Sequence, residues 1–157
     1  MTKARGSRIP TFNHVAMSVP PDALDETGRG ALLGFYSDVF GWTEMPTLTE
    51  DRKRLVLRVH HNEQFVYLVA DDDPMRAPRG DHFGLSVQTP DELDAILERA
   101  RHYRGRDDRV EIVERQTEDF KVVKLHSFYV RYLMPLMIEV QCYEWADGFD
   151  GNSLPGD

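Results

Sequence analysis

Two histidines occupy equivalent places at the starts of two similar segments. Residues 13–19 read NHVAMSV and residues 81–87 read DHFGLSV. Side chains of a strand alternate between two faces, so His14 and His82 lie on the face opposite to the apolar residues of their strands. Glu139 likewise lies opposite to the apolar residues of the late segment LMIEVQCYE. Two imidazoles and a carboxylate can hold a divalent metal and leave other positions open to water or substrate. We therefore predict a metal site at His14, His82 and Glu139, for Fe, Mn, Ni, Co or Zn.

An internal repeat is the arrangement that would position these side chains. The pattern predicts strand, helix and three strands, then a linker, then the same order again. The first set is a strand at 10–19, a helix within 31–41 and strands at 42–49, 54–60 and 64–70. The second set is a strand at 82–88, a helix within 89–105 and strands at 109–115, 121–133 and 136–144. Thr89, Pro90 and Glu92 form a helix-start signal with a capping box.

The predicted fold class is α+β, with two βαβββ modules that form a curved mixed sheet around a metal-centred cavity. One domain spans 10–144: a first module at 10–70, a linker at 71–80 and a second module at 81–144. We expect the ends, 1–9 and 145–157, to be flexible because they are polar and rich in glycine or basic residues.

The composition narrows the partners and the compartment. The chain has 157 residues and a formal net charge of −8, which opposes binding to the phosphates of nucleic acid. No apolar run approaches the roughly 18 residues of a membrane span. The basic N-terminus lacks the apolar stretch of a secretory signal, and Cys142, a single cysteine, cannot form an internal disulfide. We expect a cytoplasmic protein with no nucleic acid or membrane partner.

Four segments resemble the vicinal-oxygen-chelate superfamily, which includes glyoxalase I, bleomycin-resistance proteins, fosfomycin-resistance proteins and extradiol dioxygenases. The segments are FNHVAMSV, LLGFYSDVFGW, DHFGLSV and PLMIEVQ, and FYSDVFGW is similar to the family pattern FYxxvLG. The resemblance covers the chain from about Pro10 to Glu144. It implies paired glyoxalase-like modules, with His14, His82 and Glu139 as metal ligands from the first, fifth and eighth strands.

Two tyrosines stand at positions where the resemblance implies a role in catalysis. Tyr67 aligns with the fourth ligand of glyoxalase I, a glutamate, and a neutral phenol is a poor ligand but can hydrogen-bond to a metal-bound water. Tyr129 lies on the strand before that of Glu139, where extradiol dioxygenases often have a tyrosine. The alternative interpretation of Tyr129 is an ordinary aromatic residue of a strand. The further catalytic histidine of those dioxygenases has no clear match, since His126 has the opposite parity to Tyr129 and would need a bulged strand.

These features predict a divalent-metal-dependent enzyme that acts on a small oxygen-rich or aromatic molecule. The His-His-Glu set and Tyr67 favour a dioxygenase slightly over a glyoxalase-like lyase or isomerase, and a fosfomycin-type thiol transferase is a third alternative. A different class is a non-catalytic protein that sequesters a small molecule, as bleomycin-resistance relatives do. We expect four residues to contact substrate: Ser18, Ser86, Met137 and Gln141.

The resemblance also implies a homodimer. The modules can pair within one chain or be swapped between two chains. In the swapped arrangement, His14 of one copy would join His82 and Glu139 of the other.

Overall fold

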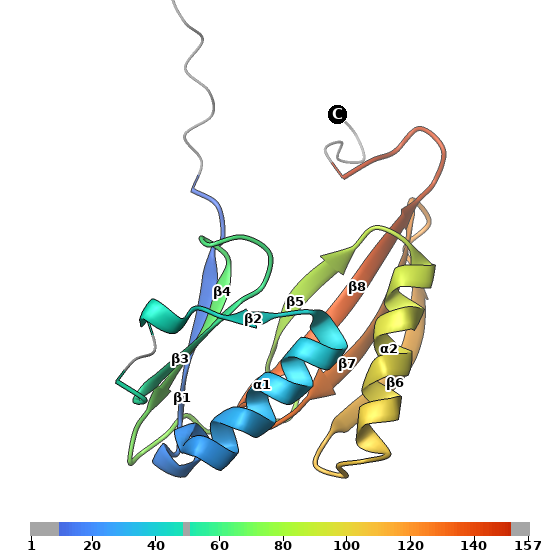
Figure 1. Cartoon of the computed structure of the whole chain (residues 1–157). Helices are drawn as coiled ribbons and strands as arrows, with labels where there is room; N and C mark the ends of the chain where they lie inside the picture. Colours follow the sequence, from blue (N-terminus) through green and yellow to red (C-terminus); the bar gives the residue numbers. More distant parts are fainter. Residues whose placement is uncertain (1–9, 49–50, 152–157) are drawn as a thin grey trace, which may run out of the picture.

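The computed structural model describes residues 10–48 and 51–151 (Figure 1). Of the ends predicted at 1–9 and 145–157, residues 1–9 and 152–157 lie outside the described residues, and β8 includes Trp145. In the first module the elements are β1 (His14–Val19), η1 (Pro21–Leu24), α1 (Glu26–Phe40), β2 (Thr43–Glu44), η2 (Pro46–Leu48), β3 (Arg54–Arg58) and β4 (Phe65–Ala70). In the second they are β5 (His82–Val87), α2 (Pro90–Arg104), β6 (Glu111–Asp119), β7 (Val123–Arg131) and β8 (Met137–Trp145).

Each module builds one mixed sheet within the described residues. The strand order is β1-β4-β3-β2 in the first sheet and β5-β8-β7-β6 in the second. In each sheet the opening strand pairs in parallel with the last strand of its module, and the other pairs are antiparallel. The predicted α+β fold of two repeated βαβββ modules is therefore confirmed, with two separate four-stranded sheets where the prediction had one curved sheet.

Two of the predicted strands depart most from the structure, whereas the others differ from it by up to four residues at an end. Of the strand predicted at 42–49, the structure describes residues 42–48. They form a two-residue strand and the short 3-10 turn at Pro46–Leu48, because proline has no N–H for a ladder bond. The strand predicted at 109–115 begins at Glu111 and continues to Asp119, with a register shift between Val113 and Gln116. Its outer half is polar and exposed, so it carries little of the alternation that reveals a strand.

The helix termini follow the local sequence. The Asp25 side chain accepts a hydrogen bond from the Gly28 N–H at the start of α1, and Gly41 ends that helix with a left-handed φ of 71°. Thr89 and Glu92 form the predicted capping box at the start of α2. No helix among the described residues is long and apolar enough to cross a membrane.

One hydrophobic core joins the two modules. Phe35 of α1 is fully buried, and its ring lies 5.1 Å from the ring of Tyr103 of α2 and 4.7 Å from that of Tyr132, which follows β7. The hydroxyl of buried Tyr36 donates to the carbonyl of Tyr132 at 2.8 Å. These contacts connect residues of the first module with residues of the second, so the core fixes how the modules sit together.

Replacing Tyr36 with phenylalanine is expected to lower the free energy of unfolding by about 1–3 kcal/mol. The substitution removes a hydroxyl without changing the ring and leaves the Tyr132 carbonyl buried without this partner. Urea unfolding followed by circular dichroism measures the change. Tyr143→Phe removes a hydroxyl from a half-exposed ring and should change stability by less than about 0.5 kcal/mol. Equal losses in both variants would contradict the assignment.

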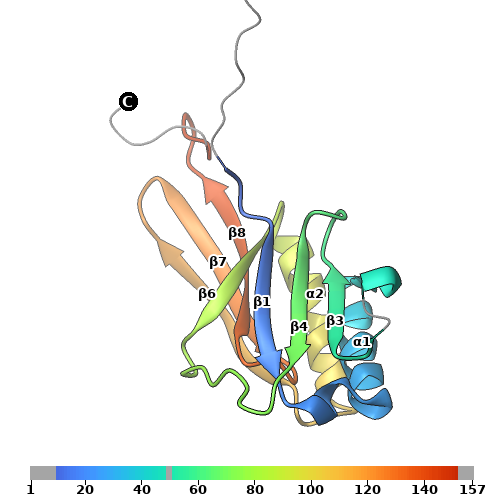
Figure 2. The ribbon, with the colours of Figure 1, turned by 90° about the vertical axis from the view of Figure 1, so that its left-hand side faces the viewer.

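Each sheet has one face against its helix and one face that no helix covers. Figure 2 shows the first sheet with the helices behind it, and in Figure 1 α2 lies in front of the second sheet. On β1, Met17 and Val19 are buried in the core while His14 is exposed, and on β8 Cys142 is in the core. The predicted alternation is confirmed. We call the face away from the helix the uncovered face of each sheet.

Candidate functional site

His82 and Glu139 meet on the uncovered face of the second sheet. They lie on the parallel neighbours β5 and β8, where Gly84 is the register partner of Glu139. The Nε2 atom of His82 is 3.2 Å from Oε2 of Glu139. The Glu139 side chain is 8% exposed and that of His82 is 37% exposed, so the pair joins a nearly buried carboxylate to an accessible imidazole.

A backbone carbonyl orients the His82 ring. Its Nδ1 atom lies 2.8 Å from the oxygen of Gly80, which can only accept a hydrogen bond, so Nδ1 carries the proton. In the neutral ring the lone pair on Nε2 then faces the carboxylate oxygen of Glu139. The Nε2 lone pair and the carboxylate oxygen are both acceptors, so at 3.2 Å they need a proton or a metal ion between them. A ring N–H bonded to a backbone carbonyl is also how metal-binding histidines are commonly held. His82 and Glu139 could therefore supply two ligands to a divalent metal.

Tyr129 completes a cluster with this pair. It is the direct cross-strand partner of Glu139, and its ring meets that of His82 edge to face at 5.2 Å. Burial, followed by a hydrogen bond to Glu139, raises the pKa of the Tyr129 phenol to about 12. The phenol is therefore neutral at ordinary pH and acts as a hydrogen-bond donor beside the carboxylate.

In metal-free protein, Tyr129 is expected to ionise near pH 12 instead of near pH 10. Because the folded pKa is raised above the unfolded value, the stabilisation is fully present below about pH 10 and is lost as the pH rises toward 12. Ultraviolet difference titration counts the tyrosines that ionise late, that is, at a pH well above 10. Burial also raises the pKa of Tyr36 and of Tyr132, so these two belong to the same late group. Tyr129→Phe should remove one tyrosine from this late group. A loss from the early group would contradict the prediction.

The third predicted ligand, His14, lies on the other sheet. Its ring stacks on Phe65 at 4.9 Å and 8°, and its Nδ1 lies 2.7 Å from the Asn13 side-chain oxygen. Because that oxygen accepts, Nε2 of His14 is left as the lone-pair nitrogen, as in His82. Among residues 10–48 and 51–151, no three His, Cys, Asp or Glu side chains of one chain could hold a metal ion together. A single chain therefore brings together two of the three predicted ligands.

The remaining predicted residues divide between the same two sheets. Tyr67 pairs with Ala16 on the first sheet and hydrogen-bonds to the Arg54 side chain. The hydroxyl of Ser18 accepts from the Met75 N–H at 2.7 Å and so anchors the linker, a structural task that the sequence did not indicate.

On the second sheet, Ser86 and Gln141 are register partners. The Gln141 side-chain oxygen accepts from the Tyr143 hydroxyl at 2.8 Å, and Met137 is buried. By strand alternation these residues share the uncovered face with Glu139. They flank the His82–Glu139 pair, whereas Ser18 and Tyr67 share the face of His14.

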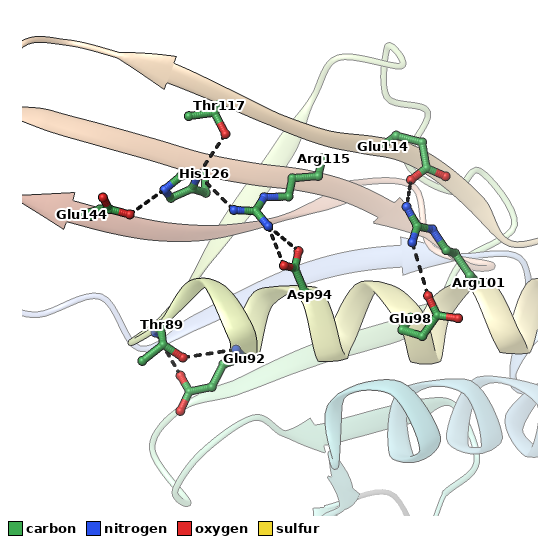
Figure 3. Close-up of polar contacts among 10 residues, drawn as sticks. All are labelled: Thr89, Glu92, Asp94, Glu98, Arg101, Glu114, Arg115, Thr117, His126 and Glu144. Atoms are coloured by element: carbon green, nitrogen blue, oxygen red, sulfur yellow. Dashed lines mark hydrogen bonds and ion pairs between the residues drawn. The ribbon is translucent and has the colours of Figure 1, made fainter.

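His126 lies on the helix-facing side of β7, as its parity indicates, and takes part in a separate polar network (Figure 3). Its Nδ1 lies 2.9 Å from the Thr117 hydroxyl and 3.2 Å from an Arg115 nitrogen, and its Nε2 lies 3.1 Å from Glu144. Arg115 also forms an ion pair with Asp94 of α2. The network ties α2 to the second sheet. Sequence patterns did not reveal it, because the register shift in β6 changes which side chains meet β7.

A cavity of about 530 Å³ lies between the modules. It is lined by the start of β1, the end of α1, part of β4 and most of β5, and it contains the aromatic residues Phe12, Phe40, Trp42, Phe65 and Phe83. Of the described residues that line it, none is Lys, Arg, Asp or Glu. Cavities of this size and character commonly bind small molecules. Two of the predicted site residues, His14 and Ser86, are among its lining residues.

No protein-family model matches the chain, and no curated protein matches it. Several solved structures are similar to it. A glyoxalase/bleomycin resistance protein from Albidiferax ferrireducens has 19% identity, with 83% of this chain and 98% of that chain covered and a TM-score of 0.56. The fosfomycin resistance protein FosX from Listeria monocytogenes has 16% identity, with 85% and 93% covered and a TM-score of 0.58. A lactoylglutathione lyase from Agrobacterium tumefaciens has 18% identity, with 87% and 96% covered and a TM-score of 0.58.

These similarities confirm the predicted family resemblance at the level of the fold. The chain has the fold of the vicinal-oxygen-chelate proteins, with two glyoxalase-like modules. A variant of the Listeria protein was solved as a complex with Mn(II) and 1S,2S-dihydroxypropylphosphonic acid.

Proposed function

We propose that this chain is a divalent-metal-dependent enzyme that acts on a small oxygen-rich or aromatic molecule. The observation that carries the proposal is the His82–Glu139 pair, with facing donor atoms 3.2 Å apart and the second ring nitrogen of His82 held by the Gly80 carbonyl. The Mn(II) and the dihydroxy compound in the Listeria relative support it, because that protein has the same fold. The metal identity stays open among Fe, Mn, Ni, Co and Zn.

The third ligand in this proposal is His14 of a second copy. Within one chain His14 is exposed on the first sheet, with its Nε2 atom as the lone-pair nitrogen, and it is not part of the His82–Glu139 cluster. In a homodimer with exchanged modules, the first sheet of one copy would face the second sheet of the other. Each dimer would then contain two sites, each built from both copies.

The residues of the chain have distinct tasks in this site. The metal, when bound, would polarise an oxygen atom of the substrate and stabilise negative charge that develops on it. His82 and Glu139 would hold the metal, and Tyr129 would donate a hydrogen bond from its neutral phenol toward a substrate oxygen or the Glu139 carboxylate. Ser86 and Gln141, which flank Glu139, would orient the polar part of the substrate.

Among the reactions of the fold, ring cleavage or another O2-dependent reaction is our first choice. This choice rests on Tyr67. It stands where glyoxalase I has its fourth ligand, a glutamate, and it forms a hydrogen bond with the Arg54 side chain. Glyoxalase-type isomerisation is second and thiol transfer to an epoxide is third. Oxygen consumption by the Fe(II)-loaded protein with a panel of catechols would separate the first reaction from the other two.

Metal analysis of protein purified without chelator tests the proposal directly. We expect about one divalent ion per chain after reconstitution with Fe, Mn, Ni, Co or Zn, since a swapped homodimer would hold two sites. Failure of the protein to retain any of the five metals would remove the proposal.

A second candidate function is metal-free sequestration of a small molecule. The uncharged, aromatic lining of the 530 Å³ cavity between the modules favours it. Thermal shift measurements distinguish the two functions, because a ligand that binds the native state raises the melting temperature. Stabilisation by metals favours the enzyme, whereas stabilisation by apolar ligands alone favours sequestration.

A further inference from the structure

A second hollow, of about 460 Å³, lies where β5 and β8 end. Its lining residues are Ser86, Val87, Gln88, Tyr143, Trp145 and Gly151. Because β5 and β8 run parallel, their last residues come together at one end of the second sheet. The hollow is therefore built by the strands that carry His82 and Glu139, but at their opposite ends.

Two aromatic rings form one wall of this hollow. Tyr143 and Trp145 are two positions apart on β8, so they share a face, and their rings are nearly parallel, at 13° with centroids 6.1 Å apart. Tyr143 is 40% exposed although it is a large aromatic side chain. Its hydroxyl donates to Gln141, which holds the ring in place along the strand. An exposed ring held in this way offers a prepared stacking surface.

The chemistry of the remaining wall limits the ligand. Among residues 10–48 and 51–151, no Lys, Arg, Asp or Glu lines the hollow, so the described lining has no side chain that would select a phosphate, a carboxylate or a cation. Ser86 and Gln88 provide a hydroxyl and an amide, which form hydrogen bonds with uncharged polar groups. Aromatic rings prefer offset or edge contacts with other rings.

We propose that this hollow binds an uncharged, planar aromatic group, which stacks on Tyr143 and Trp145 and forms hydrogen bonds with Ser86 or Gln88. Tyr143 follows Glu139 by four residues, about 13 Å along the strand, so this subsite is separate from the His82–Glu139 pair. If the proposed function holds, a substrate long enough to span this distance would place its aromatic end here and its oxygen-bearing end at the pair.

The experiment uses the full chain after metal removal, so that it does not depend on the metal site. Calorimetric titration with 2-naphthol, which is planar and neutral at pH 7, is compared with titration by decahydro-2-naphthol, its saturated and non-planar analogue. We expect 2-naphthol to bind about tenfold more tightly than the analogue, and Trp145→Ala to remove about the same factor. Trp145→Phe should retain most of the affinity, since it keeps a ring.

Two further variants separate this proposal from its alternatives. Phe120→Ala is the matched control, because Phe120 is also an exposed aromatic, at 53%, but lies outside the hollow. It should leave the affinity for 2-naphthol unchanged. The same is expected of His82→Ala, since His82 does not line the hollow. Equal affinity for the two naphthols, an unchanged affinity in folded Trp145→Ala, or an equal loss in Phe120→Ala would each overturn the proposal. A loss of binding in folded His82→Ala would also overturn the separation of the two sites.

Discussion

Glu139→Gln is expected to weaken the binding of a divalent metal by about 100-fold or more. The proposed site has a single carboxylate, and a neutral amide neither carries its charge nor binds a hard cation as strongly. Loss of a residue that only orients a ligand typically costs about 10- to 100-fold in metal affinity, so the loss of a ligand should cost at least as much. Titration with Mn(II), followed by electron paramagnetic resonance of the free ion, measures the affinity.

Glu118→Gln is the matched control for that variant. Glu118 pairs with Leu125, so it lies on the same face of the second sheet, and it is exposed. The charge of Glu118 raises the pKa of Tyr129 without contact with the proposed metal site. The substitution therefore removes a nearby negative charge and leaves the proposed metal ligands unchanged. We expect a small, salt-dependent change in metal affinity. A similar loss in both variants would show that the general negative potential, and not coordination by Glu139, attracts the metal.

Mixing two inactive variants is expected to restore roughly a quarter of the sites, if His14 acts across the dimer. His14→Ala and His82→Ala should each abolish metal binding alone. When the two are unfolded together and refolded, half of the dimers contain one chain of each kind, and one of the two sites in such a dimer has all its ligands. Metal content and activity of the refolded mixture, compared with refolded wild type, give the fraction restored.

The control mixture combines His82→Ala with Glu139→Gln. Both changes lie in the second module, so every site of every mixed dimer lacks a ligand. We expect no restoration. Recovery in this control, or no recovery in the His14 and His82 mixture despite dimers of normal size in light scattering, would exclude the swapped arrangement.

The sequence by itself determined the local features that build each module. Strand alternation placed His82 and Glu139 on one face of one sheet, and it placed Cys142 in the core. The capping signal at Thr89 fixed the start of α2. These features depend on neighbouring residues and on a period of two or 3.6, so they can be read without knowledge of the tertiary structure.

The sequence failed where long-range contacts decide the structure. Thr117 and Glu144 meet at His126 only because a register shift in β6 and the pairing of β7 with β8 bring them there. Neither the register shift nor the pairing of these strands leaves a local pattern.

Only the tertiary structure decided how the two modules sit in one chain. The repeat predicted that His14 and His82 are equivalent, but equivalence within a repeat does not bring the two residues together. The contacts of Phe35 with Tyr103 and Tyr132 join the modules through one core, and in that arrangement His14 remains apart from the His82–Glu139 pair. Such packing between distant residues is set by the shapes and volumes of buried side chains, which periodicity does not encode.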